Sequence, residues 1–284
     1  MPEIAWLAFP LLGLVAGVLA GLLGVGGGIV LVAALVALLP RFGVPVDAVM
    51  HVALATSLAS IIVTASASAH AHRRRGSVLW STVRWLAPGL VVGGVVGGLW
   101  ATRVPGQTLA LLVGAFCLLM AARMAWPTRT ASGQAGAPAD VERRVSDPRG
   151  AWLGAAGLGI GAVSAVVGIG GGSLTVPLLV SRGVATVRAV GTSSACGVVI
   201  ALASAATYAL APALGLATAA AGGAAALPAG VVGFVHVPAA LGIGAGAWFA
   251  APYGVRLAHR LSSVALNRVF AVALAGVGLA LLWP

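Results

Sequence analysis

Long apolar runs separated by short polar segments dominate the chain. The first run covers residues 4–39 and is interrupted by the sequence Gly-Val-Gly-Gly-Gly at positions 24–28. A single straight helix over this run would measure about 54 Å at a rise of about 1.5 Å per residue, whereas the hydrocarbon core of a bilayer is about 30 Å thick. The run must therefore turn at the glycines, which predicts a broken helical hairpin.

Three uninterrupted apolar runs follow this hairpin, at residues 48–71, 83–100 and 107–126, and each is long enough to cross a bilayer as a helix. Residues 127–150 then lose the apolar pattern and carry three prolines, four arginines and three of the five acidic residues of the chain. This composition is typical of a hydrophilic linker without a packed core.

The same pattern returns after the linker. Residues 151–167 lead into a second glycine break at 168–172 and a short run at 173–180, and further runs occupy 189–210, 231–250 and 264–283. Residues 17–28 align with 161–172, 53–57 with 189–193, and 97–104 with 254–261. We therefore expect two homologous membrane repeats, residues 1–126 and 151–284, each a glycine-broken hairpin followed by three transmembrane helices.

The positions of the arginines predict how the two repeats are oriented. If each hairpin is re-entrant, each repeat crosses the membrane three times and the second repeat is inverted. An outside N-terminus then leaves only Arg41 and Arg103 outside, as the positive-inside rule requires. Parallel repeats would put the arginines at 73–75 on the side opposite the linker. The prediction is an all-α integral membrane protein with inverted-topology repeats, a cytoplasmic linker and extracytoplasmic termini.

Composition excludes several other functions. The chain is 60% hydrophobic and only 7% charged, compared with about 25% charged residues in a soluble domain. Its net charge of +11 comes from arginines in short loops between apolar runs, so membrane orientation explains it and no nucleic-acid partner is expected. The expected partners are the lipid bilayer and a small ligand, and a homo-oligomer is compatible with this reading.

The reactive residue types form no recognisable catalytic or metal-binding pattern. Cys117 and Cys196 lie far apart inside apolar runs, and the five histidines are scattered. No Asp or Glu lies within the predicted spans, where transporters of protons or metal cations usually place one. We therefore expect no metal, no cofactor and no enzyme activity.

The two glycine breaks are the main candidate binding site. Unwound backbone at membrane depth is tolerated only where it lines protein or a polar cavity, and the helices that follow would point unpaired N–H groups and a positive dipole end inward. Such helix ends suit an anion, and opposed hairpins would bring them together near the midplane. The candidate residues are Gly24, Gly26, Gly27, Gly28, Gly168, Gly170, Gly171, Gly172 and Ser173. The alternative is that these glycines only permit close helix packing, as expected for Gly89, Gly93, Gly97, Gly94 and Gly98.

Hydroxyl residues at matching positions of the two halves are a second candidate set. Thr56 and Ser57 correspond to Thr192 and Ser193, and Ser194 follows them. A hydroxyl can donate to an oxyanion without the desolvation cost of a fixed charge, but it can equally bond its own helix backbone. His51 and Arg188 lie at nearly corresponding positions before these hydroxyls, where a cation could attract an anion.

These paired motifs resemble the sulfite exporter TauE/SafE family over nearly the whole chain. The resemblance rests on residues 17–28, residues 161–173 with Pro177, the two Thr-Ser pairs and residues 254–260. It implies a secondary transporter, and specifically an exporter, of sulfite or organosulfur anions such as sulfoacetate. A passive anion channel and a transporter of another small anion are the alternatives. The first hairpin departs from the second by having Ala33 where the second has Pro177.

Overall fold

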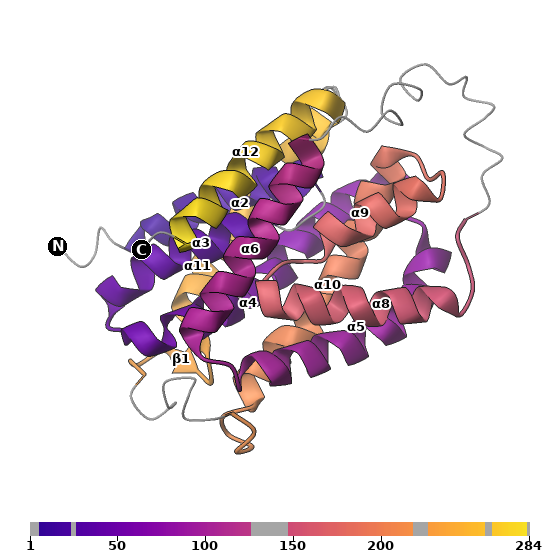
Figure 1. Ribbon diagram of the computed structural model, residues 1–284. Coiled ribbons are helices and arrows are strands. Elements are labelled where there is room, and N and C mark those ends of the chain that lie inside the picture. The colour runs from indigo at the N-terminus through magenta and orange to yellow at the C-terminus, as the bar shows by residue number, and fades with distance from the viewer. Residues whose placement is uncertain (1–5, 24–26, 126–146, 218–226, 259–262, 283–284) are drawn as a thin grey trace.

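The computed structural model describes residues 6–23, 27–125, 147–217, 227–258 and 263–282. For residues 23, 124–125, 258 and 263–270 it describes the backbone only. Ten α-helices make up most of the described chain, and the one sheet found there is a two-stranded hairpin of β1 (Val231–Val232) and β2 (Val235–His236). The predicted all-α class is therefore confirmed (Figure 1).

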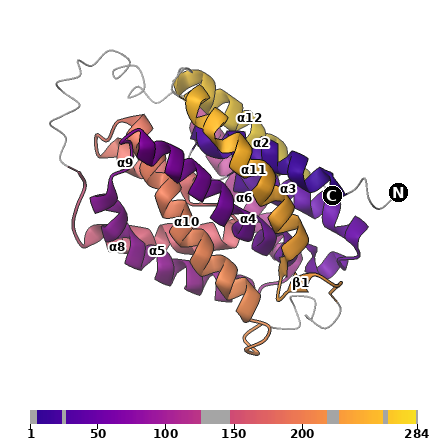
Figure 2. The ribbon, with the colours of Figure 1, turned by 180° about the vertical axis from the view of Figure 1, so that it is seen from behind.

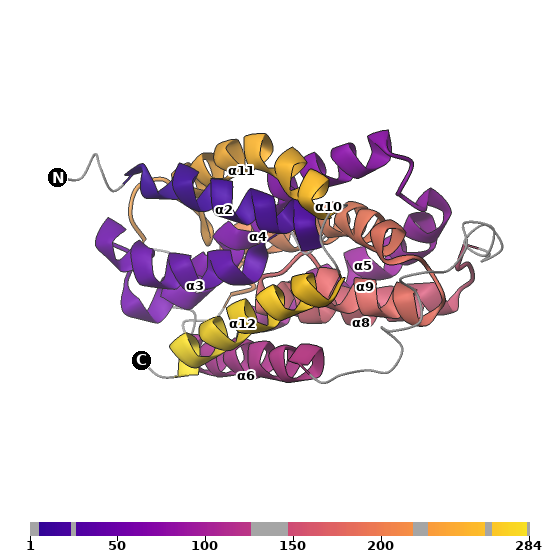
Figure 3. The ribbon, with the colours of Figure 1, turned by 90° about the horizontal axis from the view of Figure 1, so that it is seen from above.

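The first apolar run does turn at its glycines. It forms α2 (Ala8–Leu23) and α3 (Gly28–Leu38), and α3 leads through the 3-10 helix η1 (Leu39–Phe42) into the next element. Gly27 caps α3 with a φ of 69°, and a Cβ atom there would lie 2.6 Å from the carbonyl oxygen of Ala16. Only glycine tolerates both the left-handed backbone and this contact. In Figure 3, α3 runs back toward the end of the molecule at which α2 begins.

The second half repeats this arrangement. Here α8 (Trp152–Val167) and α9 (Gly172–Ser181) flank a break in which Gly168 and Gly171 have φ angles of 74° and 73°. Figure 3 shows the α2 and α3 pair toward one end of the molecule and the α8 and α9 pair toward the other. Gly28 of the first pair contacts Gly168 of the second, so the hairpins approach one another from opposite ends.

Long helices follow each hairpin. In the first half they are α4 (Val46–Arg74), α5 (Trp80–Ala101) and α6 (Gly106–Ala125), and in the second half they are α10 (Thr186–Leu210), α11 (Val237–Ala258) and α12 (Ser263–Leu282). Within the described residues, α4, α5, α6 up to Arg123, and α10 are long and apolar enough to cross a membrane. The hairpin helices have 16, 11, 16 and 10 residues, so they measure about 15 to 24 Å and fall short of a bilayer core.

The sequence placed the second run of the second half incorrectly. A span at residues 231–250 was expected, but α11 begins only at Val237 and extends to Ala258. Residues 231–236 form the β hairpin instead, because Gly230 and Gly233 adopt positive φ angles of 92° and 58° and turn the chain. An apolar β-branched pair at 231–232 therefore belongs to a strand and not to the start of the helix.

Each hairpin packs against a helix of the other half. Helix α2 lies along α11, as Figure 2 shows, and α8 lies along α5, as Figure 1 shows. Gly13 and Gly17 face Ile243 and Ala247, and a Cβ atom on either glycine would lie within 2.6 Å of the facing carbonyl oxygen. The pairs advance together along both chains, so α2 and α11 are parallel.

The α5 and α8 contact is built in the same way. The glycines Gly89, Gly93 and Gly97 meet the backbone of α8, while Gly94 and Gly98 meet side chains of α10. The packing role expected for these five glycines is therefore confirmed. The parallel arrangement recurs here, because Gly89 faces Gly154 and Gly97 faces Ala162.

Helices α4 and α10 pack against each other antiparallel through the centre of the molecule. The Oγ atoms of Ser68 and Ser194 are 3.0 Å apart, and a Cβ atom on Gly197 would lie 3.5 Å from that of Ala65. The residue numbers of the facing pairs increase along α10 as they decrease along α4, so the two helices run antiparallel. These two helices occupy corresponding places in the repeats, as do α6 and α12, which pack together on one side of the bundle (Figure 3).

Candidate functional site

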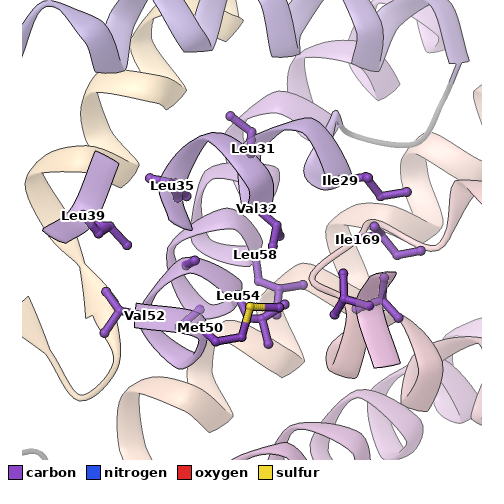
Figure 4. Packing of buried hydrophobic residues seen from close by; sticks show 14 of the residues in the cluster. Ile29, Leu31, Val32, Leu35, Leu39, Met50, Val52, Leu54, Leu58 and Ile169 are labelled. Carbon is purple, nitrogen blue, oxygen red and sulfur yellow. The ribbon is translucent and has the colours of Figure 1, made fainter. Parts of the chain in front are cut away.

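The tips of the two hairpins touch in the protein interior. A Cβ atom on Gly28 would lie 2.5 Å from the carbonyl oxygen of Gly168 and 3.1 Å from the Cα atom of Ile169. Figure 4 shows the side chains of Ile29 and Ile169 beside each other at this contact, and both are buried. The structure therefore brings together two of the candidate glycines, Gly28 and Gly168. Gly24 and Gly26 lie outside the described residues.

Ser57 joins both breaks to α4. Its Oγ atom is 3.1 Å from the carbonyl oxygen of Gly28 and 2.9 Å from that of Gly168. A hydroxyl has one proton, so Ser57 donates to these two carbonyls in a shared or alternating bond. The side chain is fully buried, and its hydroxyl is committed to holding the two hairpins against one helix.

Thr56 and Thr192 connect the two halves in matching ways. The backbone N–H of His236, just before α11, donates to Thr56 Oγ1 at 2.9 Å. The backbone N–H of Leu79, just before α5, donates to Thr192 Oγ1 at 3.0 Å, and this hydroxyl donates in turn to the carbonyl of Arg188 at 2.7 Å. Each threonine thus satisfies an unpaired amide at the start of a long helix of the other half.

The remaining serines on α10 also have partners. Ser194 lies 3.0 Å from both Ser68 Oγ and the carbonyl oxygen of Val190, and Ser193 is buried next to it with a partner of its own. The alternative, in which a hydroxyl bonds its own helix backbone, is therefore seen for Thr192 and Ser194, whereas Thr56 and Ser57 bond to other elements of the protein.

Three hydroxyls near the second break are different. Ser164, Ser173 and Thr175 are buried, and none of their oxygens has a hydrogen-bond partner among the described residues. The neighbouring glycines Gly170, Gly171 and Gly172 are buried with them. Ser173 was chosen from the sequence, whereas Ser164 and Thr175 were missed. Their polar character inside an otherwise apolar hairpin was the available signal.

His51 and Arg188 have unlike surroundings. His51 is fully buried, with Nε2 3.0 Å from the carbonyl oxygen of Val104 and its ring 5.5 Å from that of Phe234. Arg188 is 43% exposed and lies 3.7 Å from a carboxylate oxygen of Asp147. The structure therefore encloses His51 in protein and pairs Arg188 with an acid.

A basic pocket lies at the end of the molecule where the linker joins α8. Its volume is about 450 Å³, and it is lined by Ser81, Arg84, Trp85 and Arg149. Ser81 donates to Asp147 at 3.0 Å, which fixes the end of the linker against α5. Arginine side chains outnumber the single described carboxylate here, so this end of the protein attracts anions.

An aromatic cluster occupies the opposite end. The ring of His236 lies 6.0 to 6.2 Å from those of Trp6, Phe9 and Phe42, and its Nδ1 accepts the backbone N–H of Ala239 at 3.2 Å. Burial lowers the pKa of His236 below its ordinary value, which favours the neutral ring in this aromatic cluster.

Comparisons with known proteins agree on the class of protein. A family model described as "Sulfite exporter TauE/SafE" matches residues 9–281. A Haemophilus influenzae protein named "Probable membrane transporter protein" is 31% identical over 262 residues, which is 92% of each chain. No solved structure matches. Among the described residues, no group of His, Cys, Asp or Glu is arranged to hold a metal ion.

Proposed function

Because the chain belongs to the sulfite exporter TauE/SafE family of membrane transporters, we propose that it carries small sulfur-containing anions, such as sulfite or organosulfonates, across the cell membrane. It is a multi-pass membrane transporter and not an enzyme. The proposed binding site lies between the two glycine breaks, and the proposed mechanism is secondary transport.

The contact between Gly28 and Gly168 is the observation that carries this proposal. Helix α3 begins at Gly28, and α9 begins four residues after Gly168, so two helix N-termini start close to one buried point. Each N-terminus carries roughly half a positive charge, which favours an anion. Among the described helices, the only acidic side chain is Asp47 in the first turn of α4, so no described carboxylate within the bundle opposes this field.

The antiparallel packing of α4 and α10 supports inverted repeats. Corresponding helices related by an axis along the membrane normal would run parallel, whereas an axis in the membrane plane reverses them. We place the arginines of α4's end, the linker and α9's end in the cytoplasm, and Arg41 and Arg103 outside. A monoanion leaving a cytoplasm at negative potential gains about 2.3 kcal/mol per 100 mV, which favours export.

Flux measurements with the purified full chain in proteoliposomes test this function. The panel contains sulfite, methanesulfonate, sulfoacetate, sulfate and chloride, with protein-free vesicles as the blank. We expect saturable uptake of at least one sulfur anion, accelerated when the same anion is present on the far side. Uptake that neither saturates nor shows this acceleration would indicate a passive channel. Absence of flux for every sulfur anion would refute the proposal.

A further inference from the structure

The two hairpins are equal in fold but not in polarity. With Gly28 aligned to Gly172, Ser164 corresponds to Ala20, Ser173 to Ile29, and Thr175 to Leu31. The three buried hydroxyls without a partner are thus confined to the second hairpin, and the first has an apolar side chain at each corresponding position. This difference separates the roles of the two breaks.

The first hairpin is built for packing. Ala20, Ile29 and Leu31 are all at most 2% exposed, and Ile29 and Leu31 belong to the main apolar cluster together with residues of α4 (Figure 4). Such side chains offer no hydrogen bond. The first hairpin can therefore contribute only backbone groups to a polar ligand.

The second hairpin gathers hydrogen-bond donors at the start of α9. Ser164 Oγ on α8 lies 3.2 Å from the position of a Cβ atom on Gly171, which caps α9, and Ser173 lies in the first turn of that helix. The amides of Leu174 and Thr175 bond to the carbonyl of Gly171. Those of Gly172 and Ser173 have no carbonyl partner within the described residues.

These groups select a ligand class. Hydroxyls and amides at a helix N-terminus are donors in a positive field, so a ligand with several acceptor oxygens and negative charge fits them. The side chains nearest to Gly168 and Gly171 are uncharged, namely Leu54, Val32, Ile160, Ile200 and Ser164. A helix N-terminus supplies only about half a unit of positive charge. It therefore compensates the charge of a monoanion better than that of a dianion.

Building on the proposed function, we propose that within this site the second hairpin alone supplies side-chain donors to the transported anion, through the Ser164 and Ser173 hydroxyls, and adds the free amides of Gly172 and Ser173. The preferred ligand is a sulfonate or hydrogensulfite monoanion, and sulfate, as a dianion, binds less well. Thr175 supplies a further hydroxyl to the same hairpin. The first hairpin closes the site with the apolar side chain of Ile29.

The full chain in detergent and in proteoliposomes is used for the test. Methanesulfonate and sulfate are the probes, and the variants are Ser164→Ala, Ser173→Ala and, as a control, Ser204→Ala. Ser204 is also buried, but its hydroxyl has a protein partner, because it donates to the carbonyl of Gly94 on α5 at 3.4 Å. For each protein the melting temperature without ligand, its shift with ligand and the KM for methanesulfonate are measured.

We expect Ser164→Ala and Ser173→Ala each to raise the KM for methanesulfonate about tenfold or more without lowering the ligand-free melting temperature. Such variants lose a hydroxyl that has no protein partner, so a purely structural role would not give this combination. Ser204→Ala should change KM less than twofold. Wild-type protein should require at least ten times more sulfate than methanesulfonate for the same thermal shift.

Two results would overturn this assignment. If the wild type transports methanesulfonate and both site variants keep its KM, the one-sided site is wrong while the proposed function stands. If sodium chloride, but not choline chloride, stabilises the wild type and loses this effect in Ser164→Ala, the hydroxyls hold a cation. A wild type that moves no sulfur anion would instead reject the proposed function itself.

Discussion

Replacing Ser57 by alanine is expected to loosen both hairpins at once. The Ser57 hydroxyl is the donor that the structure gives to the buried carbonyls of Gly28 and Gly168, at 3.1 and 2.9 Å. Its loss leaves these carbonyls without that donor, and an unsatisfied buried polar group costs about 1–3 kcal/mol. Because one proton serves both acceptors, we expect a total loss of about 1–3 kcal/mol and not twice that amount.

Thermal unfolding of the purified protein in detergent measures this effect. For chains of about this size, 1 kcal/mol corresponds to roughly 2–4 °C. At the middle of this range, about 3 °C per kcal/mol, Ser57→Ala should melt about 3–9 °C below the wild type. Ser60→Ala is the matched control, since Ser60 lies on the same helix, is also buried, and donates only to the carbonyl of Thr56 within that helix. The control should shift by less than 3 °C. Equal shifts for both variants would refute the role of Ser57 as a clamp.

Three further expectations follow from the described geometry. Val46 and Ser181 are exposed, so a cysteine at position 46 should react with a membrane-impermeant maleimide from outside the cell, and one at position 181 from inside. The native cysteines are buried and should stay unlabelled. Labelling of both new cysteines from the same side would reject inverted repeats. Gly171→Ala should lower the melting temperature by several degrees, because φ at this position is 73° and the new Cβ atom would meet Ile200. In the control Gly159→Ala the new Cβ atom has no other atom within 4 Å, so the melting temperature should stay equal or rise. The reverse order of the two melting temperatures would contradict the structure. Because burial lowers the pKa of His236, the free energy of unfolding should be highest above the ordinary histidine pKa of 6.5 and should fall as pH drops from there through the lower folded pKa. His236→Gln should remove this part of the pH dependence of the melting temperature. An unchanged pH profile would count against this role of His236.

The helical elements could be predicted because bilayer thickness limits them strictly. A run at residues 4–39 cannot cross as one helix, and glycine at positions 27 and 171 is needed where the backbone turns left-handed. The beginning of α11 could not be read in this way, because a strand of two valines and a helix start look alike in a short apolar run.

The roles of the hydroxyls depend on tertiary contacts that no local pattern contains. The sequence matches Thr56 with Thr192, but it does not show that each receives a backbone amide from the opposite half. His51 is a candidate because it precedes these hydroxyls near a helix start, yet the structure places its ring against Phe234 and the carbonyl of Val104. Ser164 was overlooked because one serine among small residues resembles packing material.

The exchange of hairpins between the halves has a consequence for how the protein is made. The glycines of α2 at positions 13, 17 and 21 pack against α11. Gly13 therefore lacks its contact until the ribosome has added Ile243, about 230 residues later. During that interval the glycine-lined surface of α2 is without α11, the helix against which it mainly packs in the finished structure. The order of synthesis thus imposes a late docking step, and we expect a chain truncated before α11 to retain an exposed, protease-sensitive α2 instead of folding as an independent half.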